Sequence, residues 1–75
     1  MEPVIAESAR KHGHGDDEIL HALRNYVDAF GMDEGFTMIV GPTSSGKLLE
    51  VGIIRSEDGA LLVIHAMNAR DKFLR

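Results

Sequence analysis

Three short apolar runs fill the second half of the chain, at residues 36–40, 48–55 and 60–66. Each run is rich in branched and aromatic side chains, a composition typical of β-strands. A loop at residues 41–47 joins the first run to the second, and Ser56-Glu57-Asp58-Gly59 is a strong hairpin turn before the third. Connections this short join antiparallel neighbours, so the pattern predicts a three-stranded meander.

The first half has a helical pattern instead. Pro3 suits the first turn of a helix that would run from Val4 to about His12, and the glycines of residues 12–15 would end it. A second helix would be capped by Asp16 and stopped by Gly31. One face of that helix would carry the apolar side chains of Ile19, Leu23, Tyr26, Val27 and Phe30.

These elements predict an α+β fold in a single domain, residues 1–75. Two N-terminal helices would pack on a three-stranded antiparallel meander, and residues 69–75 would add a short C-terminal helical turn. With 75 residues and no cysteine, the chain can neither build a large core nor close disulfides. We therefore expect a protein partner or a homo-oligomer to add stability.

The net charge of −4 argues against an indiscriminate nucleic-acid binder, which is normally basic. The charge is uneven, however, because Arg10 and Lys11 precede the acidic middle of the chain and Arg70 and Lys72 follow it. If the fold joins these basic ends, a local positive site forms on an acidic protein. The chain shows neither a signal-peptide pattern nor an apolar run of membrane length, so we expect a cytoplasmic protein without membrane contact.

Residues 41–47, Gly-Pro-Thr-Ser-Ser-Gly-Lys, match most of a phosphate-binding loop. Leu48 stands where the motif needs a Ser or Thr hydroxyl for magnesium, and the following residues read as a strand rather than a helix. The sequence therefore predicts a plain hairpin loop without nucleotide hydrolysis. Lys47 is kept as a candidate contact to an RNA backbone.

Four histidines invite a metal hypothesis, namely His12, His14, His21 and His65. His12 and His14 lie in a flexible turn, and His21 comes nine residues after His12 on a different element, so the histidines lack the spacing of a zinc-binding helix. We expect neither a metal nor another cofactor, and we expect surface or capping roles for His14 and His21.

His65 and Arg70 are the strongest candidates for chemistry. His65 follows the apolar residues of the last strand, either as a core-edge histidine bonded to a backbone carbonyl or as a general acid or base. Arg70 either pairs with Glu50 or an acidic helix residue, or it grips a phosphate through its planar fork. The run from Arg10 to His12 is either a solvated helix end or a second wall of an RNA groove.

The Lys11-His12-Gly13 turn, the acidic-capped helix, the meander and the His65-Ala66-Met67-x-x-Arg70 ending together resemble a family of small bacterial toxins. The chain is similar, from Ile5 to Leu74, to the BrnT-like branch of the RelE/ParE superfamily of type II toxin–antitoxin modules. It departs from that family in two ways: such toxins are usually basic, and many begin with a strand.

The resemblance implies the toxin component of such a module, a metal-independent endoribonuclease acting on mRNA and held by a cognate antitoxin protein. It gives the catalytic roles to Lys11, His12, His65 and Arg70. We add Arg10, Lys47 and Lys72 as RNA-binding candidates. The alternative is a non-catalytic interaction module that binds a protein through its sheet or helix face.

Overall fold

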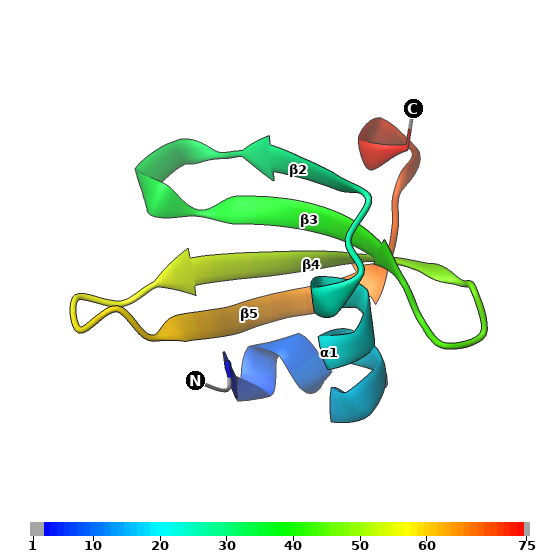
Figure 1. Cartoon of the computed structure of the whole chain (residues 1–75), viewed down its shortest axis with the longest axis horizontal. Helices are drawn as coiled ribbons and strands as arrows, with labels where there is room; N and C mark the ends of the chain where they lie inside the picture. The colour runs from blue at the N-terminus through cyan, green and yellow to red at the C-terminus, as the bar shows by residue number, and fades with distance from the viewer. Residues whose placement is uncertain (1–2, 75) are drawn as a thin grey trace.

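The computed structural model describes residues 3–74, which form one five-stranded mixed sheet with a single α-helix on one face (Figure 1). The strand order is β1-β5-β4-β3-β2, in which β1 runs parallel to β5 and the other neighbours are antiparallel. The elements in chain order are β1 (Val4–Ile5), η1 (Glu7–Arg10), α1 (Asp16–Arg24), β2 (Asp28–Gly31), η2 (Asp33–Gly35), β3 (Thr37–Pro42), β4 (Leu48–Arg55), β5 (Leu61–Asn68) and η3 (Asp71–Phe73).

The predicted architecture of two helices on a three-stranded meander is wrong. The first expected helix is instead the short strand β1 followed by the 3-10 turn η1. The β-branched residues Val4 and Ile5 pair with β5, and the ladder continues where Ala6 donates its backbone N–H to the Val63 carbonyl at 2.9 Å. This pairing gives hydrogen-bond partners to backbone groups at the edge of β5, which a helix would have left unpaired.

The second helix, α1, ends at Arg24 rather than near Phe30. Both the backbone N–H and the side-chain amide of Asn25 donate to the His21 carbonyl, at 3.1 and 2.9 Å, and this ends the helix. Residues 28–31 then form β2 at the far edge of the sheet, and Gly15 rather than Asp16 occupies the N-cap position. The expected apolar helical face is thereby divided between a helix and a strand.

The three consecutive strands expected in the second half are present as β3, β4 and β5. An irregularity between Gly52 and Ile53 shifts the register of β4 against β5. As a result Val63 and Ala66 both join the core on the helix side, although their spacing in a regular strand would send them to opposite faces.

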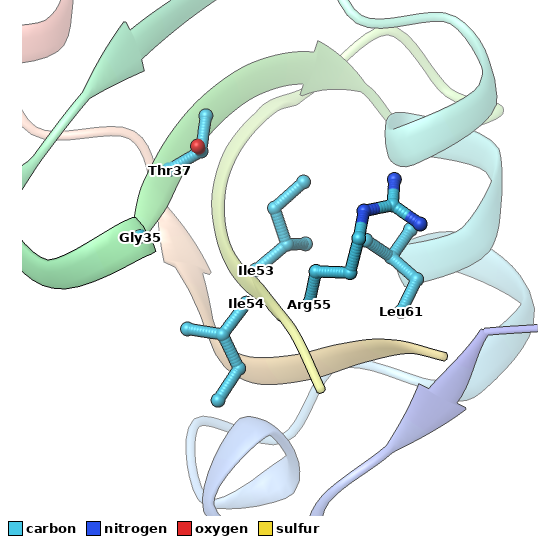
Figure 2. Close-up of a pocket in the computed structure, with 6 residues that line it drawn as sticks. All are labelled: Gly35, Thr37, Ile53, Ile54, Arg55 and Leu61. Atoms are coloured by element: carbon cyan, nitrogen blue, oxygen red, sulfur yellow. The ribbon is translucent and has the colours of Figure 1, made fainter. Parts of the chain in front are cut away.

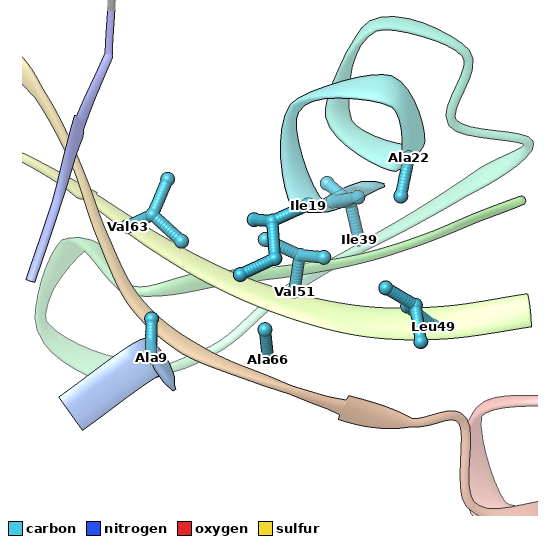
Figure 3. Packing of buried hydrophobic residues seen from close by; sticks show 8 residues of the cluster. All are labelled: Ala9, Ile19, Ala22, Ile39, Leu49, Val51, Val63 and Ala66. Carbon is cyan, nitrogen blue, oxygen red and sulfur yellow. The ribbon is translucent and has the colours of Figure 1, made fainter. Parts of the chain in front are cut away.

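The two faces of the sheet are covered differently. On one face, α1 and η1 enclose the main core, and Figure 3 shows Ile19, Ala22 and Ala9 facing the side chains of the central strands. The C-terminal segment runs from the end of β5 towards the β2 edge of the sheet (Figure 1). On the other face, Phe73 of this segment is buried against Met38 and Val40. This second face is the more open one, and it carries the candidate site.

Within residues 3–74, no helix has both the length and the apolar character needed to cross a bilayer.

Gly41 marks the closest approach between the sheet and α1. A Cβ atom at this position would lie 2.0 Å from the Ala22 carbonyl oxygen, which belongs to the helix backbone and cannot move aside. We expect Gly41→Ala to lower the free energy of unfolding by about 3 kcal/mol, measured by urea denaturation. Gly59→Ala is the control, because its turn is open and the positive φ of 88° costs only about 1–2 kcal/mol. Equal losses in the two variants would contradict this packing.

Candidate functional site

A buried carboxylate lies at the centre of the open face. Glu50 is in the middle of β4, directly opposite Val40 of β3 on one side and Met67 of β5 on the other. Its side chain is 0% exposed, although glutamate is almost never fully buried unless it is paired. A charge in this position requires partners that replace the lost water.

Two basic side chains supply those partners. The His65 ring approaches Glu50 with Nε2 2.8 Å from Oε2. Arg70 donates its backbone N–H to Oε1 at 3.0 Å, its Nε to the same oxygen at 3.0 Å, and its Nη2 to Oε2 at 2.7 Å. Both carboxylate oxygens are therefore occupied by charge-assisted hydrogen bonds, which fix the positions of His65 and Arg70 relative to each other.

These contacts determine the charge of the cluster. Burial by itself raises the pKa of the Glu50 carboxyl, but the hydrogen bonds from Arg70 and His65 outweigh it and lower the pKa to about 2 from its usual 4.5. The same contact raises the pKa of the Arg70 guanidinium. Glu50 is therefore ionised at neutral pH and can only accept hydrogen bonds.

The Glu50 carboxylate accepts a hydrogen bond from Nε2 of His65, and this contact fixes the tautomer of the ring. Because the Glu50 carboxylate has no proton to give, we assign the ring proton to Nε2, and this leaves Nδ1 with the free electron pair. The His65 side chain is 23% exposed, so it is not sealed in the core. A second imidazole lies beside it: the rings of His12 and His65 are 6.1 Å apart between centroids and nearly perpendicular, at 77°.

Arg70 uses only one edge of its guanidinium to hold Glu50. The bonded nitrogens are Nε and Nη2, so the outer edge formed by Nη1 and Nη2 points away from the carboxylate. The Arg70 side chain is 45% exposed, and its guanidinium carbon lies 5.6 Å from the centroid of the Phe73 ring. The ammonium of Lys72 lies 5.1 Å from the same ring. Two cations therefore lie close to one aromatic ring, and the outer edge of Arg70 can meet a planar anion.

The remaining basic candidates are distributed as follows. Lys11 is exposed and adjoins His12 in the turn after η1. Lys47 is exposed in the loop just before β4. Because the Leu48 carbonyl accepts a hydrogen bond from the Ala69 backbone N–H, this end of β4 lies beside the segment that carries Arg70. Arg10 points elsewhere: Glu7 binds its Nη1 at 2.5 Å, and Asp16 binds its Nε and Nη2 at 2.9 Å. We leave Arg10 out of the site.

The glycine-rich loop at residues 41–47 is a closed hairpin connection that leads into β4. Thr43 donates its backbone N–H to the Lys47 carbonyl at 2.8 Å, and the Ser44 hydroxyl donates to Glu18 of α1 at 2.7 Å. His21 donates from Nδ1 to the Pro42 carbonyl at 2.8 Å. These bonds attach the loop to α1 and give His21 a structural role.

A hollow of about 140 Å³ lies at the opposite end of the sheet (Figure 2). It is lined by Gly35, Thr37, Ile53, Ile54, Arg55 and Leu61. Arg55 donates from Nη1 to the Gly59 carbonyl at 3.0 Å and so supports the hairpin turn. We assign no chemistry to this hollow.

The predicted catalytic residues are Lys11, His12, His65 and Arg70. The structure brings His12, His65 and Arg70 together. The pairing of Arg70 with Glu50 is the alternative that the sequence left open, whereas His65 is bonded to a carboxylate rather than to a backbone carbonyl. Sequence reasoning missed the role of Glu50 in joining the two. The available signal was a lone acidic residue inside the apolar run of residues 48–54.

Comparison with known proteins adds no relative, because no family model, no curated protein and no solved structure matches the chain. Within residues 3–74, no three side chains of His, Asp or Glu gather closely enough to form a metal-binding group.

Proposed function

We propose that the protein is an endoribonuclease of the toxin–antitoxin type, in which His65, His12 and Arg70 act on one phosphodiester of mRNA. The observation that carries this proposal is the shared, buried carboxylate of Glu50. It holds an imidazole and a guanidinium side by side on an open sheet face. Such pre-positioning of a proton-transfer group and an anion-binding group is what phosphodiester cleavage requires.

In the proposed reaction, the ribose 2′-oxygen attacks the adjacent phosphorus while the bond from phosphorus to the 5′-oxygen breaks. Nδ1 of His65 removes the proton of the 2′-hydroxyl, and the Glu50 carboxylate at Nε2 stabilises the imidazolium that forms. Protonated His12 gives its proton to the departing 5′-oxygen. The products are a 2′,3′-cyclic phosphate and a 5′-hydroxyl end, and exchange with water restores both histidines.

Arg70 would neutralise the negative charge that develops on the phosphate. Its outer edge is available to a non-bridging oxygen, while its inner edge remains on Glu50. Lys72, Lys47 and Lys11 would add exposed cations for neighbouring phosphates. A positive patch on this face reconciles RNA binding with an acidic protein.

A cognate antitoxin would bind the open face and block access to Glu50 and its two partners. Exposed apolar side chains on this side, such as Val27, Leu48 and Leu74, suit the centre of a protein interface. The rival function is a non-catalytic binding module in which Glu50, His65 and Arg70 serve only stability.

Growth of bacteria expressing the protein separates the two functions. We expect expression to arrest growth and shorten cellular mRNA, and we expect Arg70→Lys to relieve the arrest. Lysine keeps a cation beside Glu50 but lacks the second edge that would hold the phosphate. Arg55→Lys is the matched control at the far hairpin and should remain toxic. Growth without arrest, or arrest that both variants share, would favour the binding module.

A further inference from the structure

A second hollow lies beside the Glu50 cluster on the same face of the sheet. It has a volume of about 340 Å³ and is lined by Val27, Asp28, Val40, Leu48, Phe73 and Leu74. Asp28 is paired with Val40 across β2 and β3, and Val40 is paired with Glu50 across β3 and β4. One row of cross-strand neighbours therefore leads from the hollow to the buried carboxylate.

Phe73 connects the hollow to the cations. Its ring is 6% exposed, contributes to the wall of the hollow and lies under both Arg70 and Lys72, at 5.6 and 5.1 Å. Phe73 is therefore shared by the two cations and the apolar hollow.

We propose that this hollow is a nucleobase subsite that receives the base next to the phosphate held by Arg70. The inference rests on the proposed function and adds to it a place that binds one base of the RNA. Apolar side chains of Val40, Leu48 and Leu74 would contact the faces of the base.

The size and surroundings of the hollow favour a base over a segment of protein. Its volume is at the lower end of small-molecule sites and suits one planar ring system, whereas a docked helix needs a longer groove. The two cations above Phe73 also match the charge of a nucleotide. An apolar side chain of a protein partner is therefore the competing occupant in the test.

Nuclear magnetic resonance titration with nucleoside 3′-monophosphates tests the subsite without any cleavage. We expect saturable shifts of the Val40, Leu48 and Leu74 amides, whereas inorganic phosphate should shift only the surroundings of Arg70. Leu48→Ala should weaken nucleotide binding about tenfold and leave phosphate binding unchanged. Leu61→Ala, in the hollow at the other end of the sheet, is the matched control and should bind as the wild type does.

Shifts that are the same for nucleotides and for inorganic phosphate would overturn the subsite, as would unchanged nucleotide binding by Leu48→Ala. In that case an apolar side chain of a protein partner becomes the better occupant. RNA cleavage by the same proteins is scored separately. Nucleotide binding in the hollow without RNA cleavage would support the subsite and refute the nuclease activity. RNA cleavage without nucleotide binding in the hollow would support the nuclease activity and refute the subsite.

Discussion

Replacing His65 with alanine should slow RNA cleavage by the purified protein by about 10²–10⁴-fold, the usual contribution of a positioned general base. The reason is that Nδ1 of His65 is the group we assign to the 2′-hydroxyl proton, and Glu50 fixes the ring that carries it. The rate is measured on a short labelled RNA.

His14→Ala is the matched control for this experiment. His14 lies in the same glycine-rich turn as His12 and is not among the groups that contact Glu50. We expect this variant to retain the wild-type rate. If His65→Ala cleaved as fast as His14→Ala, the assignment of His65 as the base would be wrong.

The folded protein should lose stability in acid because of Glu50. Its pKa is about 2 in the folded protein and 4.5 in the unfolded chain, so folding favours the ionised form. The resulting stabilisation is complete above pH 4.5 and is lost as the pH falls from 4.5 towards 2. A shift of this size corresponds to at most about 3 kcal/mol, and water around the half-exposed Arg70 reduces it to about 2 kcal/mol.

Glu50→Gln isolates this contribution, because the amide keeps the shape of the side chain but cannot ionise. We expect the variant to be about 2 kcal/mol less stable than the wild type at pH 7, with a difference that shrinks to near zero at pH 2. Urea denaturation at a series of pH values measures it. Glu57→Gln, in the exposed turn before β5, is the control and should follow the wild-type curve. A parallel loss in both variants would mean that the Glu50 cluster is not coupled to folding.

Local patterning accounts for the part of the fold that could be predicted. The apolar runs that form β3, β4 and β5 are long enough, and their turns clear enough, for the sequence to define both strands and pairing. The sequence pattern did not predict the two edge strands, β1 and β2, because each is short and is stabilised by pairing with a neighbouring strand. Val4 and Ile5 form a strand only because β5 offers an open edge, and residues 28–31 only because β3 does.

In the candidate site too, some residues could be predicted from the local sequence, whereas others depend on contacts between distant parts of the chain. His65 and Arg70 could be identified from residue type and from their place at the end of a strand. The role of Glu50 could not, because it depends on the register that sets β4 against β5 and on the return of the chain after β5. His12 reaches His65 through the turn after η1, a placement that no spacing within the sequence specifies.

Cleavage of an RNA containing one 2′-deoxynucleotide is the most direct test that the site cuts RNA through attack by a 2′-hydroxyl. The protein is incubated in EDTA with the all-RNA substrate and with a version deoxygenated at the preferred cleavage position. The proposed chemistry predicts that the first is cut to a 2′,3′-cyclic phosphate and that the second is not cut at that position. No cleavage of either substrate, or equal cleavage of both, would contradict it.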